Sequence, residues 1–254
     1  MKDEDSLSEK EKLQIKNIKN VSLKKISVSF DETHHLYQNS PLYPHRYLEV
    51  MSFHPPGVAA VLTSNGAYHI NLEGKKIYDK EFNRVFGYYD GMATVVDSSG
   101  WYHIDLEGKA LYEERYAWAG NFQEKRCPVR NEEGHYFHIK KNGTRAYEQN
   151  YKYAGDFRYR MAVVYKENGY ATHIDKDGNL IHGKEFVELN VYHKGFAMAA
   201  DEEGYFHIDK HGNSIYAHRF AAVEPFYNDF AFCQTKEGIR VIINQKGEIV
   251  HKIR

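Results

Sequence analysis

The sequence predicts an all-β repeat protein preceded by a short N-terminal arm, and three observations support this fold class. A turn signal returns every 34 or 35 residues, aromatic residues make up 15% of the chain, and no segment after residue 25 shows a helical period. A fixed period of this length is typical of repeat architectures, and aromatic side chains favour strands. The body of the chain is therefore expected to consist of short strands and tight turns.

The N-terminal residues differ from the rest of the chain. Lys and Glu are abundant in residues 1–20, and the few apolar residues there form only a rough helical stripe. We expect residues 1–25 to be a helical or disordered arm and residues 26–254 to be one repeat domain. From Ile26 to Phe30, apolar and polar residues alternate, which is typical of a half-buried strand.

Three columns of residues define the repeat. A turn residue recurs at Asn39, Gly74, Gly108, Gly143, Gly178, Gly212 and Gly247. Upstream of the turn, a histidine recurs at His34, His69, His103, His138, His173 and His207, and this column breaks near Val241. Downstream, a ring recurs at Tyr43, Tyr78, Tyr112, Tyr147, His182, Tyr216 and His251. Seven turns in register indicate a repeat unit of about 35 residues.

Each repeat is expected to contain four short strands. In one copy these are residues 116–122, 126–130, 135–139 and 145–147, and the last two are joined by a hairpin turn at Asn142-Gly143. In such turns an Asp or Asn, as at Asp105, accepts hydrogen bonds from the backbone N–H groups that follow, and a glycine closes the turn in the left-handed region. Four short strands cannot cover their own apolar faces, so the repeats must stack.

Two further columns predict how the repeats pack. Pairs with an isoleucine in second place occur at Tyr68/Ile70, Tyr102/Ile104, Phe137/Ile139, Thr172/Ile174 and Phe206/Ile208. Residues i and i+2 lie on the same face of a strand, so each pair is expected to face the core. Small residues recur at Ala93, Ala162, Ala197 and Ala231, where neighbouring sheets are expected to approach closely.

Residues 34–254 resemble the bacterial WG repeat. The run Phe157-Arg-Tyr-Arg-Met-Ala-Val-Val164 is similar to the pattern F-x-E-G-L-A-x-V of that family, and Gly100-Trp-Tyr-His-Ile-Asp-Leu-Glu-Gly-Lys109 is similar to G-K-W-G-Y-I-D-x-x-G-K. The copies are degenerate, because Trp101 is the only Trp at its column and a tyrosine follows it where the family has glycine. The resemblance implies a β-repeat fold and no defined activity.

The sequence favours a closed β-propeller of six to seven short blades over an open β-solenoid. The repeats begin in mid-unit at residues 26–43 and end soon after the seventh turn, as expected if the two ends share one blade. Ring closure would place residues 26–30 close to residues 249–254. A solenoid would separate them and leave two exposed sheet edges.

The histidine column supplies the candidate ligand-binding residues, which are His69, His103, His138, His173 and His207. Imidazole binds transition metals and polar small molecules well. Alternatively, each histidine bonds a backbone carbonyl or a neighbouring aspartate and has the same structural role in every copy. We predict no catalytic residue, metal site or cofactor, because the chain has no zinc-type Cys/His spacing, phosphate loop or G-x-S-x-G motif.

The composition indicates which classes of partner and which cellular compartment to expect. The formal net charge of −1 argues against nucleic acid and anionic membranes as partners. No run of about 18 apolar residues is present, so no spanning helix is expected. With two cysteines and no apolar leader, a reducing, cytoplasmic setting is expected.

The sequence favours a non-enzymatic scaffold that recognises a protein partner through its loops and rim. Symmetric repeats, the lack of an asymmetric catalytic cluster and 21 tyrosines are typical of a recognition surface. The alternative is a lectin-like or small-molecule-binding propeller, including a hydrolase that uses two carboxylates, with Asp90, Asp156 and Asp201 as candidates. Exposed rings beside Asp and His would favour this alternative.

Overall fold

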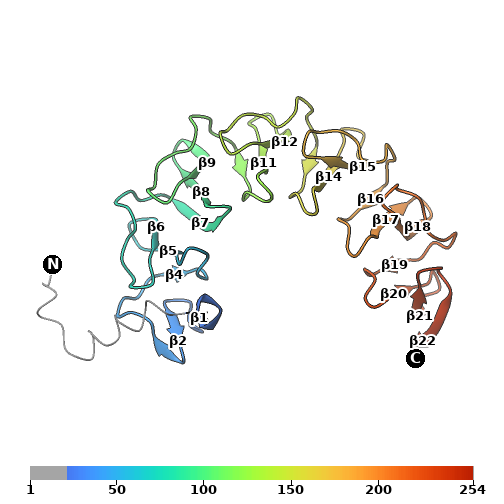
Figure 1. The fold of residues 1–254 in the computed structure, drawn as a ribbon, viewed down its shortest axis with the longest axis horizontal. Coiled ribbons are helices and arrows are strands. Elements are labelled where there is room, and N and C mark those ends of the chain that lie inside the picture. The colour runs from blue at the N-terminus through green and yellow to red at the C-terminus, as the bar shows by residue number, and fades with distance from the viewer. Residues whose placement is uncertain (1–21, 254) are drawn as a thin grey trace, which may run out of the picture. The chain divides into compact units, whose positions relative to one another are not determined.

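The computed structural model describes residues 22–253 as a succession of small antiparallel sheets (Figure 1). They form two compact halves, an N-terminal half that ends at Asn121 and a C-terminal half that begins at Phe122. The expected arm at residues 1–21 lies outside the described residues. A single closed domain over residues 26–254 depends on how the halves sit together and stays a prediction. Residues 22–253 include no helix with the length and apolarity to cross a membrane.

The N-terminal half contains three three-stranded sheets after a 3₁₀ turn, η2 (Leu23–Lys25). Their strands are β1 (Ile26–Val28), β2 (His35–Tyr37) and β3 (Ser40–Pro41); β4 (Glu49–Val50), β5 (Ala59–Leu62) and β6 (Ala67–Ile70); and β7 (Arg84–Tyr89), β8 (Met92–Asp97) and β9 (Gly100–Ile104). Strand β10 (Trp118–Ala119) ends this half. Consecutive strands pair in an antiparallel manner, so every sheet is a local structure.

The C-terminal half begins with a hairpin and continues with three sheets. The hairpin strands are β11 (Cys127–Arg130) and β12 (Tyr136–Ile139). The sheets contain β13 (Tyr153–Ala154), β14 (Met161–Tyr165) and β15 (Ala171–Asp175); β16 (Glu188–Leu189), β17 (Ala197–Asp201) and β18 (Gly204–Ile208); and β19 (Ala222–Val223), β20 (Phe230–Gln234), β21 (Arg240–Asn244) and β22 (Ile249–Ile253). The all-β repeat architecture predicted from the periodicity is confirmed.

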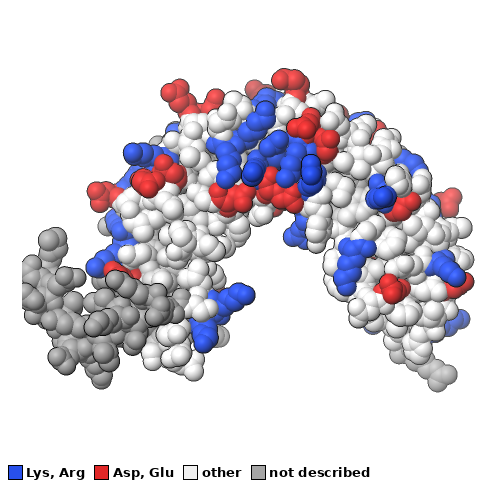
Figure 2. All heavy atoms as spheres, viewed as in Figure 1, with Lys and Arg blue, Asp and Glu red and all other residues white. Residues whose placement is uncertain are grey.

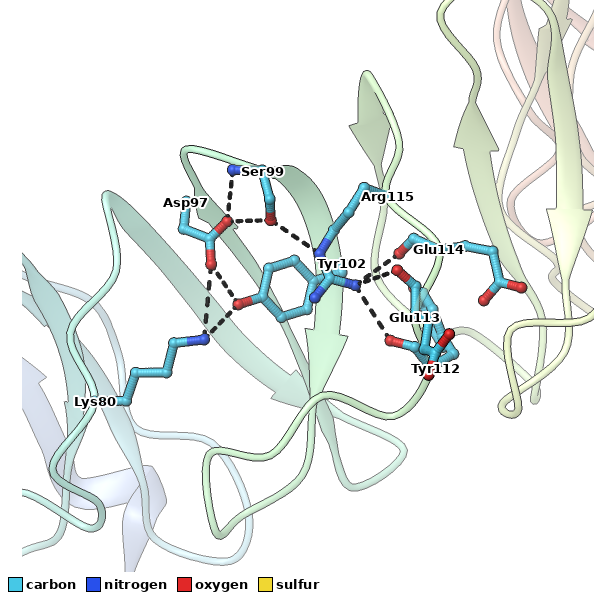
Figure 3. Close-up of polar contacts among 8 residues, drawn as sticks. All are labelled: Lys80, Asp97, Ser99, Tyr102, Tyr112, Glu113, Glu114 and Arg115. Atoms are coloured by element: carbon cyan, nitrogen blue, oxygen red, sulfur yellow. Dashed lines mark hydrogen bonds and ion pairs between the residues drawn. The ribbon is translucent and has the colours of Figure 1, made fainter.

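The fourth strand expected in each repeat forms a regular strand in the first and last described sheets, as β3 and β22. Elsewhere this segment touches its neighbour through isolated bridges, such as Ile139 with Arg145. An arginine side chain replaces the missing ladder. In Figure 3, Arg115 donates to the backbone carbonyls of residues 112, 113 and 114, and its guanidinium lies 3.7 Å from the Tyr102 ring centroid. Arg145 and Arg219 lie over Phe137 and Phe206 in the same way.

The turns follow the predicted chemistry. The Asp105 carboxylate accepts bonds from the N–H groups of Glu107 and Lys109 at 3.1 and 2.8 Å, and Gly108 closes the turn with φ at +76°. A chiral residue is strongly disfavoured in this left-handed region. The same bonds recur at Asn71, Asp175, Asp209 and Asn244.

The assignment of His34 to the histidine column is wrong, because His35 occupies that position. In the first repeat β2 and β3 are joined by a two-residue turn, Gln38-Asn39, with both φ angles positive as predicted for Asn39. This turn is shorter than the later ones, so the register moves by one residue. The side chain of His34 instead lies 3.0 Å from the hydroxyl of Thr33.

The core follows the isoleucine column. Ile70, Ile104, Ile139, Ile174 and Ile208 are fully buried, and so are the four column alanines. The histidines, on the opposite face of the same strands, are buried equally deeply. Both faces are covered because each repeat packs against its neighbours.

Successive repeats meet where a ring covers a glycine. A Cβ atom added to Gly178 would lie 2.6 Å from Cγ of Tyr147, which belongs to the preceding repeat. The same contact joins Tyr43 to Gly74, Tyr78 to Gly108, His182 to Gly212 and Tyr216 to Gly247. These glycines therefore serve both the turn and the contact between repeats.

Two glycine variants can separate these roles. Gly178 and Gly169 have similar φ angles of +83° and +88°, but no atom lies within 4 Å of a Cβ on Gly169. Both Gly178→Ala and Gly169→Ala should cost about 1 kcal/mol in backbone strain, and Gly178→Ala should cost about 1–3 kcal/mol more through overpacking. Denaturant unfolding measures the difference, and equal losses would contradict the contact.

The isoleucine column can be tested in the C-terminal half. Ile139→Ala should cost about 2–5 kcal/mol because it leaves a cavity at a fully buried position. The matched change Ile249→Ala, at a side chain with 47% exposure, should stay within about 0.5 kcal/mol. A loss below about 1 kcal/mol for Ile139→Ala, measured by urea unfolding, would contradict the assigned packing.

Candidate functional site

Each predicted column histidine makes two bonds inside the protein. The Nδ1 atom of His138 bonds the hydroxyl of Tyr147, nine residues later, and its Nε2 atom lies 2.8 Å from the carbonyl oxygen of Gly155, seventeen residues later. A carbonyl can only accept, so Nε2 carries the proton and Nδ1 accepts the tyrosine O–H. The same pattern holds at His35, His69, His103 and His207.

One repeat departs from this pattern. His182 replaces the tyrosine, and its Nε2 atom lies 3.0 Å from Nδ1 of His173. The other nitrogen of His173 bonds the carbonyl oxygen of Asn190 at 3.0 Å. His173 therefore keeps two bonds, but the partner of its Nδ1 atom is the titratable ring of His182 and not a tyrosine phenol.

A second ring packs on the imidazole in five of the repeats. The centroid of Phe157 lies 4.6 Å from that of His138, and Phe226 lies 4.3 Å from His207. Phe53, Tyr88 and Tyr192 contact His35, His69 and His173 in the same way. Burial lowers the pKa of His69, His103, His138 and His173 to about 4, so these side chains are neutral at pH 7.

The aspartates proposed as partners of the histidines instead belong to the turns, and the tyrosine hydroxyls take their place. The sequence carried a signal for this pairing, because the histidine and tyrosine columns keep a spacing of nine residues. Ligand binding by His69, His103, His138, His173 and His207 would require one of their internal bonds to be exchanged, and it stays a prediction. Within residues 22–253, no three His, Cys, Asp or Glu side chains gather as metal ligands would.

A groove of about 590 Å³ lies in the C-terminal half, across three successive sheets. We call it the tyrosine groove. Its ring-bearing wall includes Tyr153, Tyr159, Tyr165, Phe196 and Tyr227. Its polar lining includes Asp156, Arg158, Asn190, His193 and His207. His207 is thus the one predicted histidine that the structure places in this groove.

Three tyrosines of the groove keep large exposed areas. Tyr153, Tyr159 and Tyr227 are 47%, 62% and 58% exposed, whereas the column tyrosines are buried, apart from the half-buried Tyr78. Tyr159 and Arg160 form a two-residue hairpin tip with φ angles of 54° and 65°. Bulky residues are rare at positive φ, so the hairpin holds Tyr159 outward at a conformational cost.

Two polar side chains of the groove, Asp156 and His193, keep hydrogen-bonding capacity that no residue within 22–253 uses. No described residue donates a hydrogen bond to the carboxylate of Asp156 or pairs with it within 4 Å. The surrounding walls raise the pKa of Asp156, and the charge of Arg158 opposes this shift. The Nε2 atom of His193 is buried and has no hydrogen-bond partner among residues 22–253, while its ring centroid lies 4.9 Å from that of Tyr227.

The other candidate carboxylates have different surroundings. Asp201 forms an ion pair with Arg219 at 2.7 Å, and Asp90 lies at a hairpin tip of the N-terminal half with φ at 52°. The densest polar cluster of that half, shown in Figure 3, is closed on itself. Tyr102 donates to Asp97 at 2.6 Å and accepts from Lys80 at 2.8 Å, and hydrogen bonds lower the pKa of Asp97 to about 2. The hydroxyl of Tyr102 and the carboxylate of Asp97 are thus engaged inside the protein.

The neutral histidines make stability depend on pH. In the unfolded chain they have a pKa of about 6.5, whereas four of them have a pKa of about 4 in the fold. The unfolded state therefore binds more protons between these values, and stability falls as pH falls. Near pH 5, unfolding should take up about three to four protons, seen as the slope of unfolding free energy against pH. The exposed-site variant His251→Gln should keep that slope, and a slope below about one proton would refute the assignment.

The chain was compared with known proteins. Residues 70–101 and 207–236 match the WG containing repeat, and no curated protein matches the chain. Among solved structures, the computationally designed Ika8 protein has 10% identity and a TM-score of 0.50, with 90% of this chain and 83% of that chain covered. BamB from Moraxella catarrhalis has 11% identity and a TM-score of 0.51, with 90% and 84% covered.

At this identity the structural likeness shows the fold alone. BamB is a β-propeller, and the small sheets of this chain correspond to propeller blades. The two matched segments lie in different halves, and both contain the turn and ring columns described above, as Gly74 with Tyr78 and Gly212 with Tyr216. The second segment also begins at the column histidine His207. Two segments of the chain thus match the WG containing repeat, and the described sheets have the fold of propeller-type blades.

Proposed function

We propose that the protein is a non-enzymatic binding scaffold that recognises a protein partner through the tyrosine groove. One observation carries this proposal. The column tyrosines are buried or, at Tyr78, half-buried, whereas Tyr153, Tyr159 and Tyr227 stay exposed together along one groove. These exposed rings lie outside the histidine and tyrosine columns that pack the repeats together.

The physical character of the groove fits a protein partner. Tyrosine offers a large contact area with few rotatable bonds, and tyrosine and arginine are enriched among residues that dominate binding energy. Two-residue hairpins hold the tips at Tyr159-Arg160 and Lys194-Gly195, so little order has to be gained on binding. Apolar side chains such as Val163, Leu189 and Met198 line the floor between the rings.

A non-enzymatic role is supported by the carboxylates of the groove. Glycoside hydrolysis needs two carboxylates on either side of the scissile bond. Among the lining residues, Asp156 is the single carboxylate. Asp201 is engaged in an ion pair with Arg219, and Asp90 belongs to the N-terminal half of the chain, so neither lines this groove.

A glycan or small molecule is the second candidate ligand. Sugars stack on exposed aromatic rings and bond to side chains such as Asp156 and His193, and the structure places both kinds of group in one groove. A partner of high negative charge is less suitable. On the face drawn in Figure 2, basic and acidic side chains stand next to one another, which does not favour nucleic acid. We also propose a cytoplasmic location, in keeping with two cysteines buried as thiols.

Removing two rings tests the proposal. The double variant Tyr159→Ala/Tyr227→Ala should lose a specific partner about ten-fold, because each central tyrosine contributes about 1 kcal/mol or more. The control Tyr170→Ala removes a tyrosine of the same half that is 37% exposed and lies outside the groove. Quantitative affinity purification, run beside a glycan array, measures both variants. Equal partner recovery by the double variant and the control would exclude the groove as the contact surface.

A further inference from the structure

We infer that the partner inserts a basic side chain, of lysine or arginine, into the tyrosine groove between the Asp156 carboxylate and the ring of Tyr153. This inference deepens the proposed function and rests on it. The groove would then be an anchor site for one cationic residue of an extended or looped segment, and the remaining rings would pack on its neighbours.

Asp156 interrupts the repeat. It directly follows Gly155, whose carbonyl accepts the bond from His138, and it directly precedes Phe157, whose ring packs on that histidine. At the corresponding positions of other repeats the chain has Gly87, Asn121, Val191 and Pro225. None of these residues carries a charge, so stacking of the repeats does not require a carboxylate there.

The carboxylate of Asp156 is chemically open. Other aspartates of the C-terminal half accept turn N–H groups, as Asp175 and Asp209 do, or pair with an arginine, as Asp201 does. Within residues 22–253, Asp156 has neither kind of partner at bonding distance. The side chain of Asp156 is exposed along the groove, so a ligand cation could reach its carboxylate without displacing a bond within residues 22–253.

The ring of Tyr153 supplies the second element of a cation site. It is 47% exposed, and its edge is fixed by Tyr165 and Tyr136, whose centroids lie 6.0 and 5.6 Å away. Burial is the main cause of the raised pKa of its hydroxyl, and the negative charge of Asp156 adds to it, which places that charge nearby. A cation between the two would be attracted by the carboxylate and by the negative face of the ring.

Arg158 allows a test based on the direction in which the affinity for a cation changes. Its positive charge acts on Asp156 but does not reach ion-pairing distance, and it lines the same groove. A bound cation is attracted by Asp156 and repelled by Arg158. Removal of the two charges should therefore change the affinity for a cation in opposite directions.

Three short peptides serve as probes, acetyl-Gly-Lys-Gly-amide, acetyl-Gly-Arg-Gly-amide and the uncharged acetyl-Gly-norleucine-Gly-amide. Each is titrated into the full chain and followed by the NMR signals of Tyr153 and its neighbours. We expect a basic peptide to bind more tightly than the norleucine peptide, Asp156→Asn to weaken it about five-fold, and Arg158→Gln to tighten it about two- to five-fold. Glu167→Gln, an exposed charge change outside the groove, should leave binding unchanged.

Each other outcome overturns the inference. Equal binding of the norleucine peptide, absence of binding by both basic peptides, or insensitivity to Asp156→Asn would remove the cation site. Weakening of a basic peptide by both Asp156→Asn and Arg158→Gln, or its tightening by Asp156→Asn, would contradict the opposite signs that a cation site requires. If the tyrosine double variant loses its partner while the Asp156→Asn variant keeps it, the proposed function stands and the basic anchor falls.

Discussion

The fold depends on one buried bond, between a neutral imidazole and the phenol nine residues later. In the repeat of His138, the imidazole also donates to the carbonyl oxygen of Gly155, seventeen residues later, so one side chain connects three segments. With its hydroxyl held in this way, the ring of Tyr147 has a fixed position over Gly178 of the following repeat. The pairing inside a repeat and the spacing between repeats therefore follow from the same contact.

This dependence separates the residues that build the stack from those that can recognise a ligand. A column position is constrained in every copy, since a change there leaves a buried nitrogen or hydroxyl without its partner. The hairpin tips and the residue after the accepting carbonyl have no such duty. Asp156, Tyr159 and His193 occupy positions of that kind, and there the chain departs from its own symmetry.

Much of the fold could be predicted because it is local. The period, the turn chemistry of Asp105 and Gly108, and the burial of Ile139 depend on residues close in sequence. The shift of the first column histidine from His34 to His35 was not predicted. The short turn that causes it lies in the first repeat and does not alter the spacing of the later columns. The groove also escaped, since Tyr153 and Tyr227 belong to no column and only the stacking of three repeats brings them to one surface.

The exchange of tyrosine for His182 gives the array a line of weakness. Every other described junction ends in a phenol, which stays uncharged in acid, but here the ring that donates to His173 is an imidazole, and its other nitrogen, Nδ1, can take up a proton in place of the bond from the Lys184 N–H group. Asn190, whose carbonyl completes that junction, also lines the tyrosine groove. Burial and the charge of Lys184 hold the pKa of His182 below its usual value, so acid strong enough to charge this ring would loosen the repeat directly beneath the proposed binding surface.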